Sequence, residues 1–204
     1  MRMRKKPNLI PRMERCAELQ VMKPEELRGR WHEAFPQYRE IRLELGCGKG
    51  RFTCEQALRE PDVLLLALEK VPDAMVVAME RAMEQKIPNV RFLDRDAELL
   101  PEIFEPGEIA RLYINFPDPW LKKKQFKRRL TAPAFLDKYK ALLPEQGEVW
   151  FKSDNAPLFD WSLESFTGCG WSLRDMPEGT PMTDYEAKFT AEGLPIHRVV
   201  ATRP

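Results

Sequence analysis

Apolar runs alternate with amphipathic stretches from residue 41 onward, and this alternation restricts the chain to few folds. The run 63–68, Val-Leu-Leu-Leu-Ala-Leu, has no polar residue, which is typical of a strand covered on both faces. Strands are predicted at 41–45, 63–68, 90–93, 112–116, 148–152, 171–174 and 196–202. Helices are predicted at 51–59, 72–86, 133–142 and 155–166. Strands that alternate with helices favour an α/β fold with a doubly wound, mostly parallel sheet.

The length and the charge pattern predict one domain preceded by a basic arm. At 204 residues the chain fits one large core rather than two independent ones. Residues 41–204 carry the α/β pattern, whereas residues 1–40 form a poorly patterned arm. The net charge is only +1, so nucleic-acid binding has to come from local patches. The arm contains one such patch, formed by Arg2, Arg4, Lys5, Lys6, Arg12 and Arg15.

The cysteines and histidines indicate neither a metal site nor a disulfide framework. No CxxC pair occurs among Cys16, Cys47, Cys54 and Cys169, and the two histidines are isolated. The N-terminus lacks the apolar stretch of a signal peptide, and no apolar run approaches the length of a membrane span. We therefore expect a soluble cytoplasmic protein without a metal or a membrane partner. The sequence does not decide between a monomer and a homodimer.

The segment 114–131 combines a strand end, a carboxylate between two prolines, an aromatic ring and a dense basic run. Its carboxylate, Asp118, follows a predicted strand at the edge where open α/β sheets carry out chemistry. The eight residues 122–129 include six cations, which can bind a polyanion. A solvated loop is the alternative, because charge runs usually are solvated. The flanking prolines and the preceding strand favour a reaction site beside a nucleic-acid contact.

Gly46, Gly48 and Gly50 form a G-x-G-x-G loop after the first predicted strand. A dinucleotide fingerprint is G-x-G-x-x-G, and Arg51 occupies the place of its last glycine. Glu44, just before the loop, would repel a pyrophosphate but attract an ammonium group. This combination favours S-adenosylmethionine, which carries an ammonium group and a sulfonium.

Two further strand ends offer acids that suit an adenosyl ligand. Glu69 follows the strand 63–68, where an acid can accept both ribose hydroxyls. Asp96 follows the strand 90–93 and can accept the exocyclic amine of adenine; we prefer it to Asp94. A surface or capping role is the alternative for Glu69, and an ordinary N-cap is the alternative for Asp96.

From about residue 40 onward the chain resembles the bacterial tRNA (guanine-N7-)-methyltransferase family. The resemblance rests on the blocks 43–50, 114–131, 151–155 and 183–189. The Pro-Asp-Pro-Trp block with its basic run and the later Thr-Asp-Tyr-Glu block are highly specific. The resemblance implies a Rossmann-like class I methyltransferase fold, with seven strands and a last antiparallel strand. It also implies methyl transfer from S-adenosylmethionine to N7 of guanine at position 46 in the tRNA variable loop.

The resemblance further implies roles for individual residues. Contact with the methyl donor, or a place at its reactive end, is implied for Glu44, Gly46, Gly48, Glu69, Asp96 and Asp118. Substrate contacts are implied for Lys122, Asp154, Thr183, Asp184, Tyr185 and Glu186. RNA binding is implied for the run that contains Lys124, Lys127, Arg128 and Arg129. The chain departs from the family at Leu121, where proline is frequent, and at 124–126, where Arg-His-His is more typical.

Asp118 is the predicted catalytic residue. Guanine N7 has a free lone pair and no proton, so methyl transfer needs no general base. Acceleration should then come mainly from aligning nucleophile, methyl and sulfur. We expect Asp118 to orient guanine N–H groups and to favour the charge that develops on the purine. Trp120 either stacks on a base or supports the sheet.

Other interpretations remain open for parts of this pattern. Thr183 and Glu186 also form a helix-capping signature, and Asp154 can cap the helix that follows it. A nicotinamide-dependent reductase would share the fold, but the glycine spacing and Glu44 argue against it. A non-catalytic tRNA-binding protein could use the same scaffold. Acids at every expected strand end argue against loss of catalysis.

Overall fold

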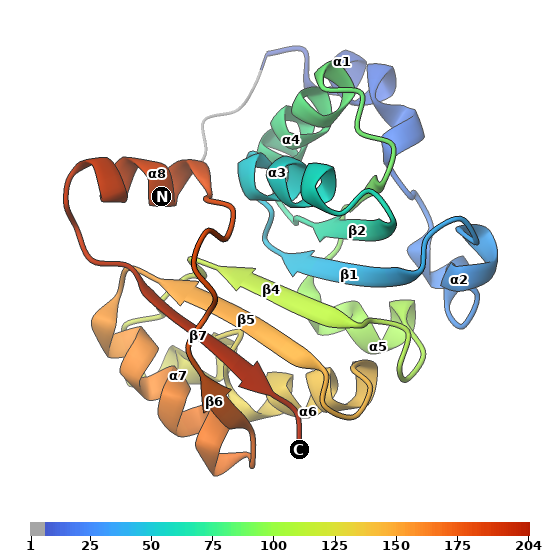
Figure 1. The fold of residues 1–204 in the computed structure, drawn as a ribbon. Helices are drawn as coiled ribbons and strands as arrows, with labels where there is room; N and C mark the ends of the chain where they lie inside the picture. The colour runs from blue at the N-terminus through green and yellow to red at the C-terminus, as the bar shows by residue number, and fades with distance from the viewer. Residues whose placement is uncertain (1–6) are drawn as a thin grey trace.

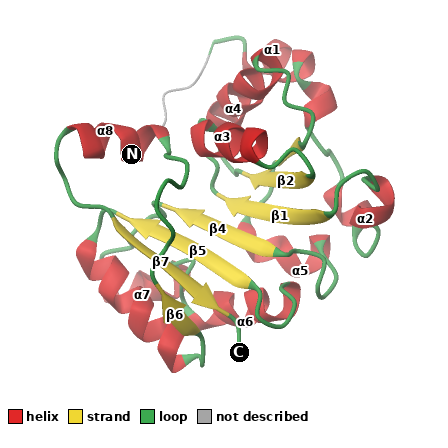
Figure 2. Ribbon diagram, in the orientation of Figure 1, coloured by secondary structure: helices red, strands yellow, loops and turns green. Residues whose placement is uncertain are grey.

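A seven-stranded sheet with helices on both faces forms the protein, in a computed structural model that describes residues 7–204 (Figure 1, Figure 2). The strands are β1 (Glu40–Leu45), β2 (Val63–Leu68), β3 (Val90–Leu93), β4 (Arg111–Asn115), β5 (Glu148–Ser153), β6 (Ser172–Arg174) and β7 (His197–Thr202). Their order in the sheet is β3-β2-β1-β4-β5-β7-β6. Strands β1 to β5 pair in parallel, and β7 runs antiparallel to both β5 and β6. The predicted fold class is confirmed.

Helices α3 and α4 cover one face of the sheet, and α5, α6 and α7 cover the other (Figure 1). The helices are α1 (Leu9–Arg15), η1 (Ala17–Leu19), η2 (Pro24–Leu27), α2 (Trp31–Ala34), α3 (Arg51–Arg59), α4 (Pro72–Glu84), η3 (Ala97–Leu99), α5 (Leu100–Ile103), η4 (Lys123–Arg128), α6 (Pro133–Leu142), α7 (Ala156–Gly168) and α8 (Asp184–Ala191). Every residue of β2 is buried. Successive residues of β2 feed opposite cores, because side chains alternate across a strand: Leu64 and Leu66 join one cluster, Leu65 and Ala67 the other. The continuous apolar run of β2 thus results from burial on both faces.

The part of the N-terminal segment that the structure describes packs on the domain. The pattern of residues 1–40 predicted no elements, yet α1, η1, η2 and α2 lie within it. Val21 N–H donates to the carbonyl of Phe92, so the segment runs along the open edge of β3. Trp31 is fully buried in the larger core cluster. Covering an edge strand also removes its free backbone groups from solvent.

The structure describes only two residues of the basic patch predicted in the arm, Arg12 and Arg15. Arg2, Arg4, Lys5 and Lys6 lie outside the described residues. Arg12 Nε donates to Glu80 on α4 at 2.7 Å, and Arg15 lies 3.6 Å from the same carboxylate. These two arginines therefore fasten α1 to α4.

Gly50 sets the close approach between α3 and α4. It has φ of 76°, in the left-handed region, and a Cβ at this position would lie 2.6 Å from Cβ of Ala78. Ala74, Ala78 and Ala82 are buried along one side of α4, so small residues meet the glycine there. Gly50 thus packs helix against helix, although Arg51 occupies the place of the last fingerprint glycine.

Within residues 7–204 no helix is both long and apolar enough to cross a membrane. The same residues contain no group of three or more His, Cys, Asp or Glu side chains arranged to hold a metal ion.

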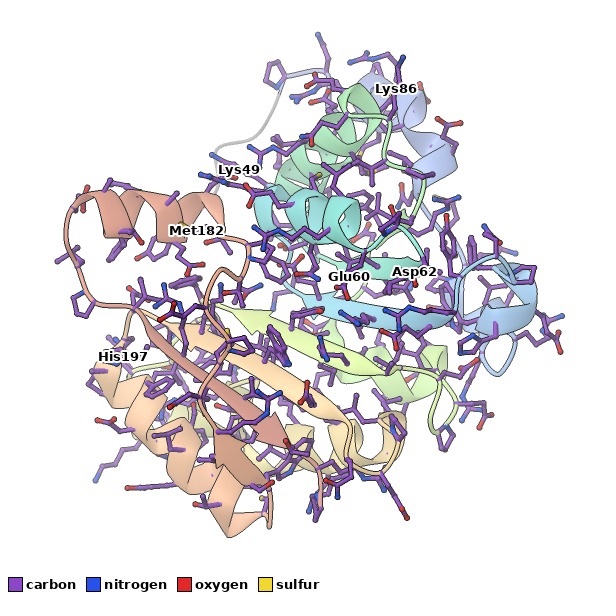
Figure 3. The ribbon with its side chains drawn as sticks, in the orientation of Figure 1. Lys49, Glu60, Asp62, Lys86, Met182 and His197 are labelled. Atoms are coloured by element: carbon purple, nitrogen blue, oxygen red, sulfur yellow. The ribbon has the colours of Figure 1, made fainter. Side chains whose placement is uncertain are left out.

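The parallel strands end at the edge of the sheet where α8 lies (Figure 1). Figure 3 shows Lys49, after β1, and Met182, just before α8, on this side of the molecule. Glu60 and Asp62 lie toward the opposite edge, before β2. The strand order reverses between β1 and β4, which is where ligands bind in open α/β sheets.

Candidate active site

A crevice of about 530 Å³ opens where β1 and β4 end, at the point where the strand order reverses. Its walls come from the ends of the first four strands and from the segment after β4: residues 45–46, 68–71, 96–98, 115–118, 120, 128, 130 and 135. The volume lies in the range of small-molecule sites, which is about 300–1,000 Å³. Of the predicted donor-binding residues, Gly46, Glu69, Asp96 and Asp118 line this crevice together.

Four backbone amides of the glycine loop, those of Gly46, Cys47, Gly48 and Gly50, donate inside the protein. Gly46 and Cys47 donate to the carbonyl of Leu68, at 2.8 and 3.2 Å. Gly48 N–H donates to Glu69 Oε2 at 2.9 Å and does not line the crevice. Gly46 does line it and has φ of 81°, a conformation that favours glycine. A pyrophosphate would need such amides free, so the loop suits a ligand without phosphate.

Glu69 and Asp96 combine structural and binding geometry. Glu69 accepts from Gly48 and Val71, each at 2.9 Å, and burial raises the pKa of its carboxyl. Asp96 caps η3 by accepting from Glu98 N–H at 3.0 Å, and it lies 3.3 Å from Lys70 Nζ. The N-cap alternative for Asp96 is thus present, and its side chain lines the crevice as well. Ionised carboxylates have spare lone pairs, so both acids can still accept from a ligand.

Glu44 does not reach the crevice, contrary to the predicted direct contact. Only 1% of it is exposed, because its carboxylate is directed into the core. It accepts from Thr53 Oγ1 at 2.5 Å and from Asn115 Nδ2 at 3.1 Å. Asn115 lines the crevice, so Glu44 acts on the crevice through this amide.

Glu44 should make stability depend on pH. Burial raises the pKa of its carboxyl from 4.5 to about 7. The folded protein then binds this proton more tightly than the unfolded chain, so the free energy of unfolding should fall as pH rises from 4.5 towards 7. The decrease is at most about 3 kcal/mol and is complete above the folded pKa. The Glu44→Gln variant should lack it.

Urea unfolding of both proteins at a series of pH values measures this difference. Parallel pH profiles for the wild type and Glu44→Gln would show that the buried carboxyl titrates normally.

The loop of residues 116–120, which we call the Asp118 loop, is held in a strained conformation. Phe116 and Trp120 have φ of 52° and 43°, which costs a non-glycine residue about 1–2 kcal/mol each. Two hydrogen bonds fix the loop: Phe116 N–H to the carbonyl of Lys152, and Arg129 Nε to the carbonyl of Pro119, both 2.9 Å. Asp118 between them is exposed and lines the crevice. Strain maintained by surrounding contacts is typical of functional sites.

The basic segment 122–129 presents most, but not all, of its cations to solvent. Lys122, Lys124, Lys127 and Arg128 are exposed, and η4 carries the last three of them. Arg128 lies over the ring of Trp120 at 5.1 Å, and both side chains line the crevice. Trp120 is half-buried, so neither base stacking nor support of the sheet is excluded by its exposure.

Arg129 is buried, unlike the other predicted RNA-binding cations, so its contact with RNA stays a prediction that this arrangement does not support. Only 4% of the residue is exposed. Its guanidinium lies over the rings of Phe126 and Trp161, at 3.6 and 4.6 Å, besides donating to Pro119. Desolvation lowers its pKa. Arg129 therefore stabilises the Asp118 loop from inside.

The block 183–186 begins α8, as its capping signature indicates. Thr183 Oγ1 accepts from Glu186 N–H at 2.9 Å. Asp184 pairs with Arg81 on α4 at 3.0 Å, and the Tyr185 hydroxyl donates to Asp154 Oδ2 at 3.0 Å. The helix after β5 is capped by Asn155, not by Asp154.

Glu186 is buried, so its predicted contact with the substrate stays a prediction that its surroundings do not support. Only 1% of it is exposed, and it pairs with Lys152 and Arg198 at 3.0 and 2.8 Å. Asp154 and the exposed Tyr185 remain near the Asp118 loop, because the Tyr185 and Phe116 rings lie 5.3 Å apart.

Sequence reasoning overlooked Asn115 and Lys152. Each is a polar residue at or next to the end of a mostly buried strand, and this position was the sequence signal for a functional role. The sequence could not indicate that Asn115 would join Glu44, nor that Lys152 would meet Glu186.

The chain is similar to known methyltransferases over nearly its whole length. Residues 38–199 match the model of a family described as putative methyltransferases. A tRNA (guanine-N(7)-)-methyltransferase of Listeria innocua is 42% identical, over 98% of both chains. One of Lachnoclostridium phytofermentans is 43% identical over 90% of both, and one of Streptococcus pyogenes is 40% identical over 98% of this chain and 99% of the relative.

Solved structures with the same fold include rRNA methyltransferases. The 16S rRNA methyltransferase KamB has a TM-score of 0.63 and 17% identity, covering 86% of this chain and 92% of its own. The aminoglycoside resistance methyltransferase NpmB1 has a TM-score of 0.61 and 20% identity, covering 90% and 95%. These likenesses support the fold, whereas the sequence relatives establish the family. The chain belongs to the tRNA (guanine-N(7)-)-methyltransferase family.

Proposed function

We propose that the protein transfers a methyl group from S-adenosylmethionine to N7 of a guanine in the tRNA variable loop, in the cytoplasm. One observation carries the proposal: a crevice lined by carboxylates adjoins an exposed basic segment, and the amides of Gly46, Cys47 and Gly48 beside it donate inside the protein. The relatives named tRNA (guanine-N(7)-)-methyltransferases support the same substrate and reaction.

The residues that line the crevice fit S-adenosylmethionine. Glu69 and Asp96 stand at the ends of β2 and β3, where they can accept from ribose hydroxyls and from the adenine amine. Gly46 leaves room for a ligand to approach the backbone, because no other atom lies within 4 Å of the position that a Cβ would take. Its positive φ also favours glycine there. Asn115 and Asp118 stand at the end of β4, toward the other side of the crevice. Three carboxylates around one crevice favour a cationic ligand.

The bound donor supplies an electrophilic methyl group on a positively charged sulfur. The lone pair of guanine N7 forms the new N–C bond while the C–S bond breaks, and its electron pair remains on sulfur. No proton moves, so no residue has to act as a base. The positive charge passes to the purine, and Asp118 is placed to stabilise it and to accept from guanine N–H groups.

The exposed part of the basic segment is the proposed tRNA contact. We expect the double variant Lys127→Ala, Arg128→Ala to bind tRNA more weakly and with a flatter salt dependence. Losing two phosphate contacts should reduce the slope of log affinity against log salt by about 2. Titrations of labelled tRNA at several salt concentrations measure both quantities.

A matched control replaces Arg39 and Arg174 by alanine. Both are about half exposed: Arg39 pairs with Asp62, just before β2, and Arg174 pairs with Glu148, at the start of β5, away from the crevice. This control should keep the wild-type slope. Equal slopes for the wild type, the double variant and the control would mean that Lys127 and Arg128 do not contact the tRNA phosphates.

A cellular measurement separates catalysis from mere binding. Mass spectrometry of tRNA from cells that lack the protein should show loss of N7-methylguanine, with recovery on adding the gene back. Unchanged N7-methylguanine would instead favour a non-catalytic tRNA-binding protein. Calorimetry with S-adenosylmethionine and with NAD tests the donor itself, and binding of NAD alone would favour a reductase.

A further inference from the structure

A buried ion pair joins α8 to the end of β5. Lys152 and Glu186 each expose only 1% of the side chain, and Lys152 Nζ lies 3.0 Å from Glu186 Oε2. The same ammonium group donates to the carbonyl of Pro181 at 2.8 Å. Glu186 also accepts from Arg198 on β7, at 2.8 Å. One lysine therefore holds both α8 and the segment that precedes it.

The backbone of the same lysine holds the Asp118 loop. The carbonyl of Lys152 accepts from Phe116 N–H at 2.9 Å. The ring of Phe116 packs against Tyr185 of α8, with centroids 5.3 Å apart. Lys152 thus contacts α8 through its side chain and Phe116 through its backbone, and α8 contacts Phe116 through Tyr185. Because Phe116 sits at a strained φ of 52°, its conformation depends on these neighbours.

We propose that Lys152 and Glu186 are positioning residues, whose buried ion pair docks α8 so that Tyr185 and Phe116 fix the Asp118 loop. The inference rests on the proposed methyl transfer and deepens it. It gives the Glu186 carboxylate a role that needs no contact with RNA. Lys152 and Glu186 do not line the crevice, so donor binding should not depend on the pair.

Breaking the pair from either side should impair catalysis. Lys152→Met leaves a buried carboxylate without its lysine, and Glu186→Leu leaves a buried ammonium without its acid. Each change should release α8 and lower turnover at saturating tRNA about 100-fold, because displacements near 1 Å can cost that much. The Kd for S-adenosylmethionine, measured by calorimetry, should stay at the wild-type value. Hydrogen exchange of the α8 amides should accelerate in both variants.

The double variant Lys152→Met, Glu186→Leu tells positioning from direct contact. It replaces the buried ion pair by apolar side chains, an exchange that proteins often tolerate without loss of stability. Arg198 keeps 36% of its side chain exposed and can be solvated without its partner. We expect slow exchange of α8 to return and turnover to recover to within about tenfold of the wild type.

The proposal is overturned if the double variant is as inactive as Glu186→Leu alone, or if it does not fold. The first outcome would mean that the Glu186 carboxylate contacts the substrate directly. Lys188→Met is the matched control, because it makes the same substitution at an exposed position of α8 and should leave turnover at saturating tRNA and exchange unchanged. A failure of the proposed function would look different from a failure of this inference. If the proposed function is wrong, the wild-type protein methylates no tRNA, while hydrogen exchange still measures the docking of α8.

Discussion

Replacing Asp118 by asparagine is expected to reduce methyl transfer to tRNA by at least about 100-fold. The side chain stands in a loop fixed by Phe116, Pro119 and Arg129, so an amide can occupy nearly the same place. The amide has lost the negative charge, and its NH₂ group would face guanine N–H donors. Donor binding should largely survive, with Kd changed by less than about tenfold, because Gly46, Glu69 and Asp96 remain.

Single-turnover kinetics with saturating donor measures the first effect, and calorimetry measures the second. Asp94→Asn is the matched control, since Asp94 also follows a strand of the sheet but does not line the crevice. It should turn over like the wild type. Near-normal turnover of Asp118→Asn would remove Asp118 from the chemistry.

Replacing Trp31 by alanine is expected to lower the free energy of unfolding by about 3–5 kcal/mol. The indole is fully buried, packs at 5.4 Å from the ring of Phe104, and donates through Nε1 to the carbonyl of Ile103 at 3.0 Å. Truncation would leave a large cavity and an unpaired carbonyl beneath the sheet. Urea denaturation followed by circular dichroism measures the loss.

The neighbouring His32 provides the control, because it lies exposed on the same short helix and its change to alanine should cost little. A Trp31→Ala variant as stable as His32→Ala would mean that the N-terminal segment adds little to the stability of the domain.

The sheet was predictable because its strands depend on local patterns. The apolar run of β2 and the prolines that begin α4 and α6 mark these elements in the sequence itself. The short helices α1 and α2 were not predictable, because helices of seven and four residues show too little periodicity. Trp31 is buried through contacts with α5, far along the chain, which no window around it reveals.

The candidate site divides in the same way. Glu69, Asp96 and Asp118 follow strands, and parallel strands end at one edge, so their convergence follows from topology. The burial of Glu44, Arg129 and Glu186 was not predictable, because folding brings their partners from other elements. A charge in a motif gives no indication of whether solvent or a buried partner surrounds it.

Methyl transfer by the purified protein tests the central claim most directly. The protein is incubated with methyl-labelled S-adenosylmethionine and an unmodified tRNA transcript, and the labelled nucleotide is then mapped. We predict a single N7-methylguanine in the variable loop. Label at another atom or another position, or no label in tRNA at all, would contradict the account.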